Sequence, residues 1–292
     1  MKQPTLNNFL KLAKCPKCKG KLIEKADGVK CQLCNDIYFY NSDGILLFYP
    51  RKKDEKITDK YEEPNFVEWY TGILAFGNEV LGKGQMESLH RTVSQLVLST
   101  AIKKPPTFIL DIGCGVGRAT SDCATYLGDS FVVGLDLSER KLSMAKKIVQ
   151  GKENIRLALA HFGFHGTKIK GHGLDNTFLL QANAEFLPFS DSIFDLVINV
   201  NLIDRVINPE NTLKNMVSVL KSGGKFIFTS PLNWSNSNLW DKYPCIEDIQ
   251  KLFENNGLII DEIFDGLFYR EIQDARGSYS DWNTTVVSAI KK

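Results

Sequence analysis

Four cysteines near the N-terminus have the residue type and spacing of a metal site: Cys15, Cys18, Cys31 and Cys34. They form two C-x2-C pairs separated by 12 residues, enough chain for a hairpin that returns the second pair to the first. Four thiolates in this arrangement bind Zn²⁺ tetrahedrally and leave no position for a catalytic water. We therefore predict a structural zinc ribbon. A redox C-x-x-C pair is the alternative, but the surrounding sequence lacks the βαβ pattern typical of such proteins.

A second motif, TFILDIGCGVGRAT, begins with an apolar stretch that ends at Asp111 and continues with Gly113, Gly115 and Gly117. It predicts a strand, a glycine turn and a helix, an arrangement that holds a nucleotide. A second strand, FVVGLD, ends 19 residues after the last glycine at Asp136, whose carboxylate can accept hydrogen bonds from ribose hydroxyls. The carboxylate before the turn would repel a diphosphate and favour a cation. This charge favours S-adenosylmethionine, which has a sulfonium and an ammonium group but no phosphate.

The D-x-G-x-G-x-G string resembles the first motif of class I methyltransferases, and the resemblance covers about residues 107–292. It implies a doubly wound, Rossmann-like α/β sheet of seven strands, the last antiparallel, with both ligands above the carboxyl ends of the parallel strands. It also implies further cofactor contacts beyond the glycine turn, from Asp136 and Leu137 at the ribose and from Asn183 and Ala184 at the adenine. Asn183 departs from the family pattern, because many relatives have Asp there, whereas an amide both accepts and donates hydrogen bonds.

Asn201, Asp204 and Arg205 follow directly after a strand predicted at 193–200. They have a purely structural interpretation, in which Asn201 caps a short turn, Asp204 is its capping partner and Arg205 is solvated. They also have a functional interpretation, because the loop after the fourth strand of this architecture faces the transferable methyl group. In that interpretation these side chains contact the methyl acceptor.

The N-L-I-D-R string resembles two groups of enzymes that methylate an imidazole nitrogen: the methyltransferase domain of ovothiol biosynthesis, which acts on 5-thiohistidine, and the DREV-type protein histidine methyltransferases. The similarity to the ovothiol domain continues through FTSPLNW, Trp240 and the tail GLFYREIQDARGSYSDWNTTVV. In this chemistry Asp204 would accept from one ring N–H and select the tautomer, while Asn201 would position the ring or the substrate backbone. Arg205 would hold a substrate carboxylate or support Asp204. Tyr70 would serve as a lid, with core packing as its alternative role.

An insertion before the third strand, IRLALAHFGFHGTKIKGHGLDN, contains three of the four histidines: His161, His165 and His172. We expect an exposed loop that covers the substrate rather than a metal site, because no cysteine or carboxylate cluster accompanies them. The remaining cysteines are expected to have no catalytic role: Cys114, Cys123 and Cys245.

Changes of composition divide the chain into three parts. Residues 1–50 form the ribbon, and residues 51–84 form a linker and covering segment that opens with the charged stretch RKKDEKITDKYEEP. Residues 85–292 form the methyltransferase domain, which begins with an amphipathic helix at 85–102. The later elements are predicted as a helix at 209–221, a strand at 225–230, a helix at 246–256 and strands near 258–264 and 284–290.

Charge is uneven along the chain. The net charge is +2, but the first 60 residues contain 13 Lys and Arg against 7 Asp and Glu. A basic N-terminal part is suited to bind RNA or another acidic partner, although small zinc domains are often basic for solubility alone. An alternative function is therefore an RNA methyltransferase, because a basic ribbon before a class I domain resembles the ribosomal RNA guanine-N1 methyltransferases. A second alternative is a non-catalytic binding protein, against which the intact Asp111, glycines and Asp136 argue.

Composition also indicates where the chain works. No apolar run approaches the ~18 residues that a membrane helix needs, so no membrane partner is expected. The N-terminus lacks the apolar core of a secretory signal, and we therefore expect a cytoplasmic protein whose seven cysteines are thiols. The acceptor can be a free amino acid, a peptide or a protein side chain, and the sequence indicates no oligomeric state.

Overall fold

The computed structural model describes residues 3–48, 62–82, 86–103 and 105–292. Most of the predicted charged linker therefore lies outside the described residues. No helix within the described ranges is both long enough and apolar enough to cross a membrane.

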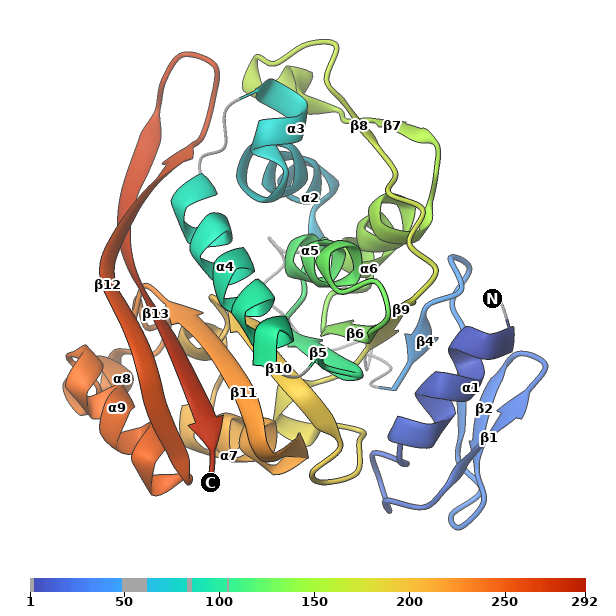
Figure 1. Cartoon of the computed structure of the whole chain (residues 1–292). Coiled ribbons are helices and arrows are strands. Elements are labelled where there is room, and N and C mark those ends of the chain that lie inside the picture. Colours follow the sequence, from blue (N-terminus) through green and yellow to red (C-terminus); the bar gives the residue numbers. More distant parts are fainter. Residues whose placement is uncertain (1–2, 49–61, 83–85, 104) are drawn as a thin grey trace.

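The N-terminal residues 3–48, here called the front module, consist of a helix packed on a small antiparallel sheet, followed by a short strand that pairs with the central sheet (Figure 1). The helix α1 (Gln3–Leu12) carries Leu6, Phe9 and Leu12 at helical spacing, and all three side chains are buried. The sheet strands are β1 (Leu22–Lys25), β2 (Gly28–Cys31) and β3 (Ile37–Phe39).

A twisted sheet of eight strands, in the order β12-β13-β11-β10-β5-β6-β9-β4, forms the centre of the molecule. All its strands are parallel except β13, which is antiparallel to both neighbours. The strands are β4 (Leu46–Leu47), β5 (Phe108–Ile112), β6 (Phe131–Asp136), β9 (Thr177–Gln181), β10 (Phe194–Val200), β11 (Leu220–Ser230), β12 (Leu258–Ile272) and β13 (Tyr279–Lys291). The predicted doubly wound, Rossmann-like fold is confirmed, and β4 adds an eighth strand to the seven that were expected.

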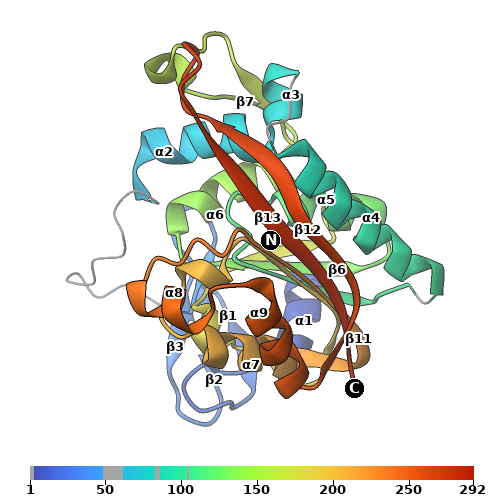
Figure 2. The same ribbon diagram turned by 90° about the vertical axis from the view of Figure 1, so that its left-hand side faces the viewer.

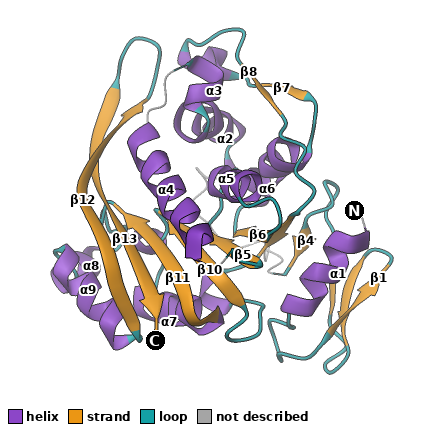
Figure 3. Ribbon diagram, in the orientation of Figure 1, coloured by secondary structure: helices purple, strands orange, loops and turns teal. Residues whose placement is uncertain are grey.

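Helices cover both faces of this sheet (Figures 1 and 3). Successive strand residues point to opposite faces, so Leu196 packs with the helices of one face and Val197 with those of the other. The first face carries α4 (Glu87–Lys103), α5 (Arg118–Tyr126) and α6 (Glu139–Ala145), and the second carries α1, α7 (Pro209–Val219) and α9 (Ile246–Asn255). The short helix α8 (Ser237–Lys242) precedes α9. The helices on each face therefore pack directly on the strands whose ends carry the predicted site residues.

The described part of the covering segment, residues 62–82, is largely helical. α2 (Pro64–Trp69) continues into a π-helix at Tyr70–Ala75, and α3 (Gly77–Leu81) follows. The insertion is not simply a loop, because β7 (Asn154–Arg156) and β8 (Lys168–Lys170) pair antiparallel within it.

The C-terminal hairpin is longer than the sequence pattern predicts. β12 and β13 extend past the sheet and reach the covering helices (Figure 2). The ring N–H of Trp69 donates to the carbonyl of Ile272 at 3.0 Å, and the Ser88 hydroxyl donates to the carbonyl of Phe268 at 2.9 Å. The hairpin therefore closes one side of the space above the strand ends.

The front module and the central sheet share one core, so loss of a contact between them should destabilise the whole chain. The Phe9 ring is fully buried and stacks on Phe178 of β9 with centroids 4.0 Å apart. We expect Phe9→Ala to lower the free energy of unfolding by about 3–5 kcal/mol. The control Phe39→Ala removes a ring that is 50% exposed and should cost less than about 1 kcal/mol. Urea unfolding measures both; equal effects would contradict a shared core.

Candidate active site

The glycine turn connects β5 to α5 with three residues in the left-handed region. Gly113, Gly115 and Gly117 have φ of +75°, +56° and +86°. A Cβ atom at position 113 would lie 2.9 Å from Leu202, and one at position 115 would lie 3.5 Å from the ring of Tyr70. Glycine is therefore favoured at all three positions by the backbone conformation, and at position 113 also by the close approach of Leu202.

Asp136 ends β6 and fixes this turn. One oxygen of its carboxylate accepts from the Gly115 amide at 2.9 Å, and the other accepts from the Ser138 amide at 2.8 Å. The side chain is partly exposed, so its remaining lone pairs can accept from ribose hydroxyls. Leu137 follows directly and is also partly exposed.

Asp111 lies beneath the turn, and its side chain faces α5. It is 1% exposed, and its carboxylate accepts from the Thr120 hydroxyl at 2.6 Å. Burial raises the pKa of Asp111 to about 7, and the charge of Asp136 adds to the increase. The Asp111 carboxylate is thus buried against α5 and is not exposed beside the turn, as the predicted preference for a cationic ligand required.

Asn183 and Ala184 follow shortly after the end of β9. The Asn183 side-chain oxygen accepts from the Glu185 amide at 2.8 Å and caps a 3-10 turn at Ala184–Phe186. Its side-chain oxygen is thus used within the loop, which leaves the NH₂ group as the donor toward a ligand. Ala184 is buried.

Asn201 follows β10 with a φ of +51°, a conformation that asparagine tolerates better than most residues. Its amide donates to the carbonyl of Thr229 at 3.0 Å, and its side-chain oxygen accepts from the Thr229 hydroxyl at 2.7 Å. It does not cap the short turn Ile203–Arg205, whose N-cap residue is Leu202. Asn201 instead links the ends of β10 and β11.

Asp204 is fully buried one turn later. One carboxylate oxygen, Oδ1, accepts from the Ser230 hydroxyl at 3.2 Å, and the other, Oδ2, lies 3.3 Å from Nε of Arg205. That second oxygen has no hydrogen-bond partner within the described part of the chain. Burial raises the pKa of Asp204, and the Arg205 guanidinium opposes the increase. The charges of both residues also act on the buried hydroxyl of Tyr269, on β12.

Tyr70, one of the predicted acceptor residues, contacts the glycine turn. Its ring packs on Gly115, and Nζ of Lys141 lies 5.0 Å from the ring centroid. Leu202, between Asn201 and Asp204, packs on Gly113 on the other side of the same turn. The predicted cofactor residues and the predicted acceptor residues therefore meet at the glycine turn.

Sequence analysis did not single out Thr229, Ser230 or Tyr269. The first two lie in FTSPLNW, and only their position at the carboxyl end of β11 shows that they contact Asn201 and Asp204. Tyr269 comes from a hairpin whose reach depends on tertiary packing. The sequence could have indicated Thr229 and Ser230 but not Tyr269, because Ser-Pro after a strand predicts where that strand, β11, ends.

The four cysteines of the front module converge. Their Sγ atoms all lie within 4.8 Å of one another, with Cys15 and Cys34 at 3.7 Å and Cys18 and Cys31 at 3.4 Å. A tetrahedral Zn²⁺ with bonds of about 2.3 Å needs sulfur atoms about 3.8 Å apart. The amides of Leu33 and Cys34 point at the sulfur of Cys31 and would stabilise a thiolate there. The donor set and its spacing fit zinc.

The histidines of the insertion form no metal-binding group with other described residues. His161 and His165 are exposed, and Nε2 of His172 lies 3.2 Å from the carboxylate of Glu79 on α3. The three cysteines outside the cluster are free thiols: Cys114 and Cys123 are buried, and Cys245 is exposed.

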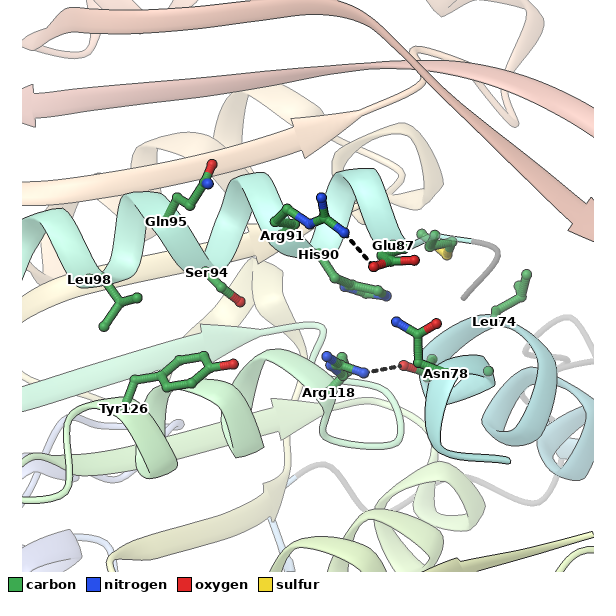
Figure 4. Close-up of a pocket in the computed structure, with 13 residues that line it drawn as sticks. Leu74, Asn78, Glu87, His90, Arg91, Ser94, Gln95, Leu98, Arg118 and Tyr126 are labelled. Atoms are coloured by element: carbon green, nitrogen blue, oxygen red, sulfur yellow. Dashed lines mark hydrogen bonds and ion pairs between the residues drawn. The ribbon is translucent and has the colours of Figure 1, made fainter. Parts of the chain in front are cut away.

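A surface groove of about 320 Å³ lies between α3, α4 and α5 (Figure 4). Its lining includes Arg91, which pairs with Glu87, and Arg118, which pairs with Asp122. His90 also lines it, and burial lowers its pKa to about 3. None of the predicted cofactor or acceptor residues lines this groove, so it is separate from the site described above.

Comparison with known proteins gives one family match: residues 110–228 match the family described as "Methyltransferase domain". A ubiquinone/menaquinone biosynthesis C-methyltransferase UbiE of Wigglesworthia glossinidia brevipalpis is 24% identical over 220 residues, 73% of this chain and 76% of that protein. A demethylmenaquinone methyltransferase of Symbiobacterium thermophilum is 29% identical over 179 residues, 61% of this chain and 60% of that protein.

Two solved structures share the fold. The magnesium protoporphyrin IX methyltransferase ChlM of Synechocystis PCC 6803, solved with bound SAM, has a TM-score of 0.51 at 17% identity and covers 82% of this chain and 100% of its own. The [4+2]-cyclase SpnF has a TM-score of 0.53 at 15% identity and covers 80% of this chain and 93% of its own. Since one is named a methyltransferase and the other a cyclase, the fold alone does not define the reaction.

The raised pKa of Asp111 predicts a pH-dependent cost of folding. Between about pH 4 and 7 the folded chain keeps a proton that the unfolded chain has released, so stability falls as the pH rises through this window. In Asp111→Asn the position does not titrate. The free energy of unfolding of this variant, relative to the wild type, should therefore rise by roughly 2–4 kcal/mol from pH 4 to pH 8.

Urea unfolding of both proteins across this range tests the expectation. Asp129→Asn, which changes an exposed carboxylate, should show no such trend. A constant difference between Asp111→Asn and the wild type would mean that Asp111 is ionised throughout.

Proposed function

We propose that the chain is a class I S-adenosylmethionine-dependent methyltransferase whose methyl acceptor is an imidazole nitrogen; the match of residues 110–228 to a methyltransferase domain supports the first part of this proposal. The acceptor would be histidine, 5-thiohistidine or a histidine-containing peptide or protein. The observation that carries the proposal is the buried carboxylate of Asp204 after β10, whose Oδ2 pairs with Arg205 at 3.3 Å but accepts no hydrogen bond within the described part of the chain.

A neutral imidazole supplies that donor. Its N–H would bond to Oδ2 of Asp204, and this bond selects the tautomer whose other nitrogen has a free lone pair. That nitrogen lies on the opposite side of the ring and would face the glycine turn, against which Leu202 packs. Alkylation creates a positive charge on the ring, and a carboxylate held in a water-poor site stabilises it as it forms.

Neighbouring side chains would complete the acceptor site. The Arg205 side chain is about one third exposed and lies beside Asp204, so it can bind a substrate carboxylate while it opposes the effect of burial on the Asp204 pKa. Asn201 is fixed by Thr229, and its NH₂ group can position the ring or the substrate backbone. Tyr70 would cover the reacting atoms and exclude water.

The cofactor would bind along the ends of β5, β6 and β9. S-adenosylmethionine supplies an electrophilic methyl group on a sulfonium when it is bound. The glycine turn would lie beside it, Asp136 can accept from the ribose hydroxyls, and Asn183 can meet the adenine edge. In the reaction a carbon–nitrogen bond forms as the carbon–sulfur bond breaks, and the ring N–H proton is later released to solvent.

A second candidate is methylation of a ring carbon in a quinone precursor. The names of several relatives favour it, since two are ubiquinone/menaquinone biosynthesis C-methyltransferases and a third is a demethylmenaquinone methyltransferase. RNA methylation, with the basic front module as a clamp, is a further outcome that the same assay can detect.

We also propose that Cys15, Cys18, Cys31 and Cys34 hold one structural Zn²⁺. The support is the chemistry and spacing of the four sulfur atoms. Zinc would fix the two knuckles and the sheet between them, which the short strands of the front module alone cannot do.

The acceptor is tested by transfer of labelled methyl from S-adenosylmethionine to histidine, 5-thiohistidine, histidine peptides, a demethylated naphthoquinol and undermethylated ribosomal RNA. We expect label in an imidazole compound. Asp204→Asn should lower the rate at least about 10²-fold, because it removes the charge that stabilises the imidazolium, without changing S-adenosylmethionine affinity.

The control is Asp241→Asn, which changes an exposed carboxylate on α8 and should leave the rate unchanged. Label in the naphthoquinol alone would establish the second candidate instead. Label in RNA alone, lost when the front module is disabled, would overturn the imidazole proposal.

Metal content tests the zinc proposal directly. Mass spectrometry of the purified protein should find one zinc per chain, and Cys31→Ser should lose it together with several kcal/mol of stability. Cys245→Ser, at an exposed cysteine far along the chain, should keep both. Equal zinc content in the two variants would refute a site made of the four front-module cysteines.

A further inference from the structure

The front module is built into the edge of the central sheet where the cofactor is expected to bind. β4 pairs parallel with the last two residues of β9, Leu46 with Leu180 and Leu47 with Gln181 (Figure 1). The amide of the next residue, Phe48, donates to the carbonyl of Gln181 at 2.9 Å. The end of β9 therefore has its backbone held by a segment from the front module.

The Gln181 side chain extends this connection to the neighbouring strand. It is fully buried, and its Nε2 donates to the carbonyl of Leu137 at 3.3 Å. Leu137 comes directly after Asp136, whose own carbonyl accepts from the Ala182 amide at 3.1 Å. The amide group of Gln181 thus fixes the peptide unit that follows the carboxylate expected to hold the ribose.

A continuous series of contacts leads from this point back to the cysteine cluster. The Phe48 ring meets Tyr38 edge to face with centroids 4.9 Å apart, and the Tyr38 hydroxyl lies 3.2 Å from Sγ of Cys15. A second connection runs through the turn after β3, where the Asn41 side chain donates to Glu139 at 3.4 Å, near the start of α6.

We infer that Gln181 is a positioning residue for the cofactor, through which the front module supports the ribose end of the site. The inference rests on the proposed cofactor site at Asp136 and Leu137. Gln181 does not need to touch the ligand, because it acts by holding the Leu137 peptide. Loss of this hydrogen bond would allow the segment after β6 to move, so part of the binding free energy would go into ordering it.

The expected consequence is a change in cofactor affinity rather than in chemistry. Gln181→Met keeps the length of the side chain, removes the donor and leaves the Leu137 carbonyl without it. A neutral hydrogen bond of this kind contributes about 0.5–1.5 kcal/mol, which corresponds to roughly 2- to 12-fold in affinity. We expect the Kd of S-adenosylmethionine to rise by that factor, with kcat at saturating cofactor changed less than about 2-fold.

Gln150→Met provides a matched control. Gln150 also donates from its side-chain amide to a backbone carbonyl of β9, that of Thr177 at 3.0 Å, but at the opposite end of the strand. A merely structural role predicts similar losses of stability in both variants and no change in cofactor binding. A positioning role predicts weaker binding in Gln181→Met alone.

Isothermal titration calorimetry with S-adenosylmethionine, together with urea unfolding, measures both quantities. Phe48→Leu, which keeps an apolar side chain but removes the ring contact with Tyr38, serves as a second variant and should weaken binding in the same direction. Unchanged affinity in Gln181→Met and Phe48→Leu, or equal weakening in Gln150→Met, would overturn the inference. Absence of binding to the wild-type protein would instead refute the proposed cofactor site.

Discussion

The hydrogen bond from the Gly115 amide to the carboxylate of Asp136 holds the cofactor side of the site in shape. It joins the turn after β5 to the end of β6 at 2.9 Å, where the two strands are paired in the sheet. A turn with three left-handed residues within five positions is costly unless something fixes it. The strand pairing sets the distance and Asp136 supplies the acceptor. Tyr70 and Leu202 can pack on this turn only while it keeps that conformation.

Two carboxylates are buried at the same edge of the sheet, and burial raises the pKa of both, but their neighbours differ. A buried carboxylate costs free energy unless hydrogen bonds and opposite charges compensate. The hydroxyl of Thr120 is the main partner of Asp111, whose pKa rises to about 7. Asp204 has the guanidinium of Arg205 beside it, and this cation opposes the effect of burial. Of the two, Asp204 is the one suited to stabilise a positive charge that forms during a reaction.

Local sequence patterns predicted those parts of the molecule in which the contacting residues are close together in the sequence. The C-x2-C pairs, the strand–turn–helix at the glycines and the alternating buried strands are of this kind, and the fold class followed from them. β4 could not be predicted, because two residues carry no periodicity and their pairing with β9 spans more than 130 positions. The length of the C-terminal hairpin was missed because its outer part is mostly exposed and is held by contacts with α2 and α4.

The part of the chain that matches the methyltransferase family, 110–228, contains the predicted cofactor residues and the N-L-I-D-R string. It does not contain the side chains that surround them. Tyr70 comes from the covering segment, Ser230 follows the matched region, and Tyr269 comes from the long hairpin. Relatives below 30% identity therefore bear on how the cofactor is held more than on which acceptor fits. A fold that is shared with a cyclase leaves the reaction to such side chains. Under the proposed function, the acceptor would be selected where Asp204 meets elements from outside the matched region.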